Sequence, residues 1–134
     1  ARVLDGFAGT GAMGIEAWSR GATWVSFVEN SPRHFTTMTD NLRTAKVPTP
    51  AWEAQRSPAG LSGPFDLIIA DPPYEQGLAL VQALIAETAL WHAGTLLVWE
   101  RSKTRGEEPT LAPGERVHQT PSGKTVFDFY RPAA

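Results

Sequence analysis

The sequence contains no cysteine, which excludes disulfide frameworks and any zinc or iron site built on cysteine ligands. It also has no apolar run that approaches the roughly 18 to 20 residues of a membrane span, and no signal-peptide pattern opens the chain. Basic charge is not in excess, because 12 Lys and Arg stand against 14 Asp and Glu. The three histidines show no ligand spacing. We therefore expect no metal site and no membrane contact, and by default a cytoplasmic protein.

The chain does contain enough apolar material for a folded core. Hydrophobic residues make up 42% of the 134 residues, with five Trp and six Phe. A chain of this length buries roughly two-thirds of its unfolded surface, so it can fold without metal or disulfide links. We expect one domain over residues 1–134, and a monomer.

Strand and helix patterns alternate along the chain. A short apolar run at residues 3–4 precedes a glycine loop, and the segment that follows ends as a helix at Gly21. Further strands are expected at 23–28, 65–70 and 95–99, and further helices from Pro32 and at 78–85. The segment 48–64 is expected to be mainly connection, with at most one short strand around residues 51–52. A terminal hairpin spans 116–130. The pattern predicts an α/β fold with a doubly wound, mostly parallel sheet and an antiparallel C-terminal hairpin.

The glycine loop Asp5-x-x-x-Gly9-x-Gly11 follows the first strand and opens the first helix. Glycines let a ligand approach the backbone, and the helix N-terminus offers free N–H donors. Glu29 ends the next strand, near the ~20-residue offset at which an acidic residue reaches ribose hydroxyls. Dinucleotide sites use glycines to admit a pyrophosphate, whereas here an Asp stands at the end of the first strand, and the carboxylate of Asp5 would repel a pyrophosphate but suit an ammonium group. These features favour S-adenosylmethionine, although Asp5 could instead cap the turn and Glu29 could be a solvated strand end.

A second loop, Asp71-Pro72-Pro73-Tyr74, follows the strand at 65–70. Ligands in open α/β sheets bind at the carboxyl ends of the strands, so this loop and the glycine loop should meet at one cavity. The Asp71 carboxylate and a backbone carbonyl near Pro72 could accept both N–H groups of a nucleobase amine, and Tyr74 could stack on the base. The alternative is a proline-rich turn that Asp71 caps.

Segments 3–12, 14–22, 28–29 and 65–74 together resemble the bacterial 16S ribosomal RNA guanine-N2 methyltransferase family. The resemblance extends to about Trp99 and, weakly, to the terminal hairpin. It implies a Rossmann-like class I fold, ribosomal RNA or the small ribosomal subunit as partner, and S-adenosylmethionine as cofactor. The implied cofactor-binding residues are Asp5, Phe7, Ala8, Gly9, Gly11, Glu29, Asn30 and Glu53, with Glu53 near the adenine. The implied catalytic residues are Asp71, Pro72, Pro73 and Tyr74.

The chain departs from the family pattern at two places. Gly6 stands where the family has a bulkier residue, and the family's basic N-terminal arm is absent from this chain, so we expect a short RNA-binding extension to be missing. Basic residues that could contact RNA are few. They are Arg101, Lys103, Arg105, Arg116, Lys124 and Arg131.

We expect methyl transfer to the N2 amine of a guanine in 16S ribosomal RNA. An amino-methyltransferase acting on adenine N6, or on another amine of DNA, RNA or protein glutamine, is the nearest alternative. An inactive cofactor-binding module is the alternative from a different class.

Overall fold

The computed structural model describes residues 1–73, 77–103 and 109–132. Its strands are β1 (Arg2–Asp5), β2 (Trp24–Val28), β3 (Trp52–Gln55), β4 (Phe65–Ala70), β5 (Trp91–Ser102), β6 (Glu115–Ser122) and β7 (Thr125–Arg131). Its α-helices are α1 (Ala12–Ser19), α2 (Pro32–Thr44) and α3 (Gly77–Ala86), joined by 3₁₀ turns at Thr49–Ala51 and Thr88–Leu90. No helix within these described ranges is long and apolar enough to cross a membrane.

The seven strands form one sheet in the order β3-β2-β1-β4-β5-β7-β6. The first five pair in parallel, and β7 pairs antiparallel with both β5 and β6. The strand order reverses between β1 and β4, which is the switch point where doubly wound sheets bind ligands. The structure confirms the expected α/β fold with its antiparallel C-terminal hairpin.

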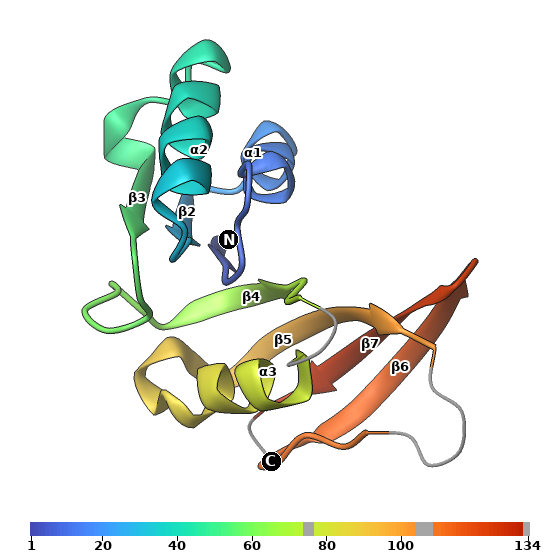
Figure 1. Cartoon of the computed structure of the whole chain (residues 1–134). Coiled ribbons are helices and arrows are strands. Elements are labelled where there is room, and N and C mark those ends of the chain that lie inside the picture. The colour runs from blue at the N-terminus through green and yellow to red at the C-terminus, as the bar shows by residue number, and fades with distance from the viewer. Residues whose placement is uncertain (74–76, 104–108, 133–134) are drawn as a thin grey trace.

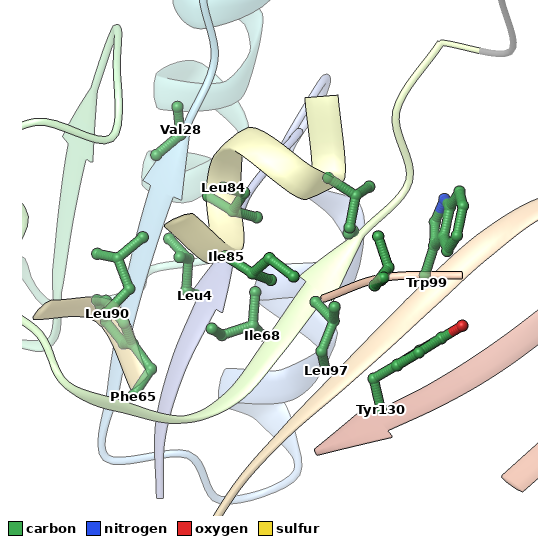
Figure 2. Close-up of a cluster of buried hydrophobic side chains, with 13 residues drawn as sticks. Leu4, Val28, Phe65, Ile68, Leu84, Ile85, Leu90, Leu97, Trp99 and Tyr130 are labelled. Atoms are coloured by element: carbon green, nitrogen blue, oxygen red, sulfur yellow. The ribbon is translucent and has the colours of Figure 1, made fainter. Parts of the chain in front are cut away.

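Helices cover both faces of the sheet (Figure 1). On one face, α1 and α2 pack over β1 and β2 through a cluster that contains Phe27, Met38 and Leu42. On the other face, α3 packs through Leu84 and Ile85 onto the apolar side of the sheet. Figure 2 shows these two side chains among their neighbours, which are Leu4, Val28, Phe65, Ile68, Leu90, Leu97, Trp99 and Tyr130.

The approach of α1 to the sheet depends on Gly14. A Cβ at this position would lie 2.3 Å from Cε1 of Phe27, inside any real contact distance. Phe27 is fully buried, so its ring has little room to move away. Gly14 therefore holds α1 close to β2 and fixes where the glycine loop sits.

Two strands differ from the sequence expectation. β5 begins at Trp91 and runs to Ser102, well beyond the expected 95–99, because its second half pairs with β7. β3 forms at Trp52–Gln55, where at most one short strand around residues 51–52 was expected, and it pairs with β2 at the edge of the sheet. Neither the added parts of β5 nor β3 contains a continuous apolar run. Pairing with a neighbouring strand therefore determines these segments, and local hydrophobicity does not.

Candidate active site

A cavity of about 1030 Å³ opens where the parallel strands end. Its volume lies at the upper limit of the ~300–1,000 Å³ typical of ligand pockets. Loops after four neighbouring strands line it, together with α3 and the far part of β5. The residues that line it include Phe7, Gly9, Glu29, Asn30, His34, Arg56, Asp71, Pro72, Pro73 and Glu100.

The glycine loop presents open backbone to this cavity. Gly9 has φ of +56°, a left-handed conformation, and a Cβ built there would find nothing within 4 Å. Gly11 also has positive φ and is the N-cap of α1, but a Cβ there would strike Met38 at 2.8 Å. Gly9 therefore leaves room for a ligand, whereas Gly11 makes room for the helix behind the loop.

Glu29 fastens the glycine loop to the end of β2. Its Oε1 accepts a hydrogen bond from the Gly9 N–H at 2.8 Å, and its Oε2 accepts one from the Ser31 N–H at 2.8 Å. His34 Nδ1 lies 4.0 Å from the same Oε2. Each carboxylate oxygen keeps a second lone-pair direction, so Glu29 can still accept hydrogen bonds from a ligand in the cavity.

Asp5 lies beneath the loop, with only 3% of its surface exposed. Its Oδ2 accepts the Gly14 N–H at 3.0 Å, so it caps the first turn of α1. The pKa of Asp5 is raised to about 6, mainly by burial and also by the charges of Asp71 and Glu29, against the lowering effect of the Gly14 hydrogen bond. Asp5 therefore caps the turn, which was the alternative to ligand binding. Its interaction with the ammonium group of a ligand stays a prediction.

Asp71 stands at the mouth of the cavity directly after β4. Partial desolvation raises the pKa of Asp71, while a hydrogen bond from Glu100 opposes that rise. Pro72 is buried and Pro73 is exposed, and a Cβ on Gly77 would meet Pro72 at 3.5 Å and Trp99 at 3.9 Å. The Asp-Pro-Pro turn is therefore seated between the start of α3 and the end of β5. Tyr74 lies outside the described residues.

The remaining predicted cofactor residues lie in different places. Phe7 and Asn30 line the cavity, and the Asn30 carbonyl accepts a hydrogen bond from Arg56 Nη2 at 2.6 Å. Ala8 is buried under the loop, where its N–H donates to the Val28 carbonyl at 2.9 Å. Ala8 thus ties the two strand-end loops together from behind.

Glu53 is not among the residues that line the cavity. Its Oε2 accepts hydrogen bonds from Ser26 Oγ at 2.9 Å and from the Ser62 N–H at 3.4 Å. Glu53 lies inside β3, and the residues that reach the cavity come after the strand has ended. They are Arg56, Ser57 and Pro58.

Sequence reasoning missed Glu100 and His34. Glu100 follows Trp99 as Glu29 follows Val28 and Asp71 follows Ala70, so a carboxylate after a buried strand was the available signal. His34 lies in the first turn of α2, where its side chain faces Glu29. Within the described part of the chain, no group of three or more His, Asp or Glu side chains is arranged to hold a metal ion.

The candidate basic residues separate by position. Arg101 is buried, and its Nε donates to Asp128 Oδ2 at 2.6 Å, so the expectation that it could meet RNA phosphates is wrong. Arg131 donates to the Gly94 carbonyl at the opposite end of the sheet. Lys103 and Lys124 are exposed and joined by a backbone hydrogen bond of 3.0 Å, on the cavity side. Arg105 lies outside the described residues.

Comparison with known proteins decides the family. The family model described as "Conserved hypothetical protein 95" matches residues 1–131. The chain belongs to this family. Ribosomal RNA small subunit methyltransferase D of Escherichia coli K12 is 27% identical over 135 residues, which cover 98% of this chain and 68% of that protein. The Haemophilus influenzae protein of the same name is 33% identical over 118 residues, covering 82% of this chain and 60% of that protein.

Solved structures agree with this assignment. A conserved hypothetical protein of Streptococcus pyogenes has a TM-score of 0.80 at 30% identity, covering 96% of this chain and 84% of its own. The Escherichia coli protein yhhF has a TM-score of 0.82 at 27% identity, covering 100% of this chain and 76% of its own. These findings confirm the resemblance to the small-subunit ribosomal RNA methyltransferases and the Rossmann-like class I fold.

Proposed function

We propose that this chain transfers a methyl group from S-adenosylmethionine to the exocyclic N2 amine of a guanine in 16S ribosomal RNA. Its family makes it a ribosomal RNA methyltransferase. The observation that carries the finer proposal is that Gly9 and Glu29 line the same cavity at the switch point as Asp71 and Pro72.

The residues present fit the cofactor. Gly9 leaves the space that a ligand would need beside the loop, and Glu29 retains acceptor capacity for ribose hydroxyls. The charge pattern also fits, because the carboxylates of Glu29 and Asp71 lie near enough to Asp5 to add to the effect of burial in raising its pKa. Such a site attracts a cation and opposes a pyrophosphate. Asp5 acts in this account through its charge beneath the loop.

The bound cofactor supplies the methyl group as an electrophilic sulfonium carbon. The acceptor amine is a weak nucleophile, since its lone pair is delocalised into the base. Asp71 accepts one N–H of the amine and the Pro72 carbonyl the other, which orients the lone pair along the line of displacement. Pro72 and Pro73 fix this turn because their φ angles are locked. Tyr74, which follows them in the sequence, is expected to stack on the base.

Proton release completes the reaction. When the new C–N bond forms and the sulfonium C–S bond breaks, the amine nitrogen carries an extra proton. Asp71, whose pKa is raised by desolvation, is placed to accept that proton. The neutral methylamino group then remains on the base, so the chain needs only to orient the amine and receive one proton.

Methylation of isolated small ribosomal subunits tests the proposal. The chain is incubated with methyl-labelled S-adenosylmethionine and subunits from a strain that lacks the corresponding gene, and the RNA is digested to nucleosides for mass spectrometry. Label in N2-methylguanosine supports the proposal. Label in N6-methyladenosine would move the acceptor to adenine, and label in neither nucleoside would contradict the proposal.

A further inference from the structure

Asp71 and Glu100 form a carboxyl pair at the ends of neighbouring strands. Ala70 of β4 is the register partner of Trp99 of β5, so the next residues along the two parallel strands are Asp71 and Glu100. Both side chains line the cavity from these adjacent positions, near enough for each to shift the pKa of the other. A hydrogen bond between two carboxyl groups requires that one of them carries a proton.

The surroundings favour a shared proton. Desolvation raises the pKa of Glu100, and the charge and hydrogen bond of Asp71 raise it further. The other charged groups at or near the cavity include both acidic and basic side chains. The acidic groups are Asp5 beneath the glycine loop, Glu29 after β2 and Glu87 after α3, and the basic groups are His34 on α2 and Arg56 after β3.

We propose that Glu100 is a positioning residue for methyl transfer, holding one carboxylate oxygen of Asp71 through a shared proton so that the other faces the acceptor amine. This inference rests on the proposed function. Glu100 does not touch the reacting atoms in this account. It acts by reducing the orientations open to Asp71 and by leaving the pair with one negative charge instead of two.

Two substitutions separate this role from simple packing. Glu100→Ala removes the donor and should lower the single-turnover rate about tenfold or more, with cofactor affinity within a few fold of the unchanged chain. Glu100→Gln keeps an N–H donor toward Asp71 at every pH. It should therefore retain a larger share of the rate than Glu100→Ala does.

The pH profile gives the sharper readout. The unchanged chain loses the shared proton as the pH rises through the raised pKa of Glu100, whereas the glutamine variant cannot lose its donor. The ratio of the Glu100→Gln rate to the unchanged rate should therefore increase with pH. Glu16→Gln makes the same chemical change on the exposed surface of α1, and its ratio should be independent of pH.

A titration that needs no activity completes the test. Side-chain carboxyl NMR of the labelled chain should show the pKa of Glu100 raised, and Asp71→Asn should bring it down toward the ordinary glutamate value. An unaltered Glu100 titration in that variant would overturn the proposal, as would a Glu100→Ala chain with unchanged rate and pH profile. If the chain without any substitution transfers no methyl group, that result would instead overturn the proposed function.

Discussion

Asp5 faces two opposing demands at the scale of one residue. Its carboxyl group is buried under the glycine loop, where burial disfavours the charged form, yet the proposed function needs that charge near a cationic cofactor. The result is a pKa of about 6, raised from the usual 3.8. The buried charge of Asp5 lowers the stability of the folded chain, while it serves the binding of a cationic ligand in the proposed function.

The pKa of Asp5 predicts a pH-dependent stability difference. The folded chain favours the protonated carboxyl, so this group's contribution is fully present below pH 3.8 and is lost as the pH rises through about 6. Asp5→Asn stays neutral, so at pH 7.5 its free energy of unfolding should exceed that of the unchanged chain by about 2–3 kcal/mol. Denaturant titrations at pH 4 and pH 7.5 measure the difference, which should disappear at the lower pH.

Asp40→Asn is the control, because Asp40 is an exposed partner of Arg43 on α2. Its stability difference should be small at both pH values. An Asp5→Asn chain that is equally destabilised at pH 4 and pH 7.5 would show that the hydrogen bond to Gly14, and not the buried charge, dominates at this position.

Cofactor affinity should also depend on the ionisation of Asp5, but it should increase as the pH rises, whereas the stability of the fold decreases. Binding of a cationic group favours ionised Asp5, so below pH 6 the dissociation constant for S-adenosylhomocysteine, which keeps the ammonium group, should rise by up to about tenfold per pH unit. Isothermal titration across pH 5 to 7.5 checks this. Asp5→Asn should bind more weakly and show a flat profile, and an equally steep profile in that variant would assign the pH dependence to another group.

At the scale of elements, the terminal hairpin is joined to the parallel sheet by a buried ion pair. The side chains of Arg101 on β5 and Asp128 on β7 are only 6% and 0% exposed, and Gln119 of β6 donates to the second oxygen of Asp128 at 2.7 Å. The pair therefore connects three adjacent strands. Its position inside the sheet explains why Arg101 cannot serve an external ligand.

Arg101→Ala should lower the free energy of unfolding by about 3–5 kcal/mol, because Asp128 would lose its main buried counter-charge. Lys103→Ala, at an exposed basic residue two positions away, should change stability by less than about 0.5 kcal/mol. Thermal and denaturant unfolding of both variants measure this. Similar stability losses would contradict the account of the hairpin.

Element boundaries also set how well the site could be predicted. Asp5, Glu29 and Asp71 each end a strand that is visible as an apolar run, so their convergence at one edge followed from the sequence. β3 is a short edge strand without such a run, and the residues after its end, Arg56 to Pro58, line the cavity, whereas Glu53 does not. Glu100 follows the apolar part of β5 in the same way, so the same signal was available for it.

At the scale of the whole molecule, the fold class and the family were accessible from the alternation of strands and helices and from two loop motifs. The contacts between those loops could not be predicted from the sequence, because they depend on strand register and on close packing. The bond from Gly9 to Glu29 and the pairing of Asp71 with Glu100 arise only when β1, β2, β4 and β5 lie side by side. Sequence patterns predicted which loops would form the cavity, and the sheet determines which side chains meet there.

In the proposed function, one cavity has two halves, with the methyl donor held beside Gly9 and Glu29 and the acceptor amine held by Asp71. Parallel measurement of S-adenosylhomocysteine affinity and single-turnover methyl transfer to small subunits for Asp71→Ala tests this division. We predict a dissociation constant within about threefold of the unchanged chain and a rate at least about 100-fold lower. Equal losses in affinity and rate would contradict the claim, because Asp71 would then belong to the donor half.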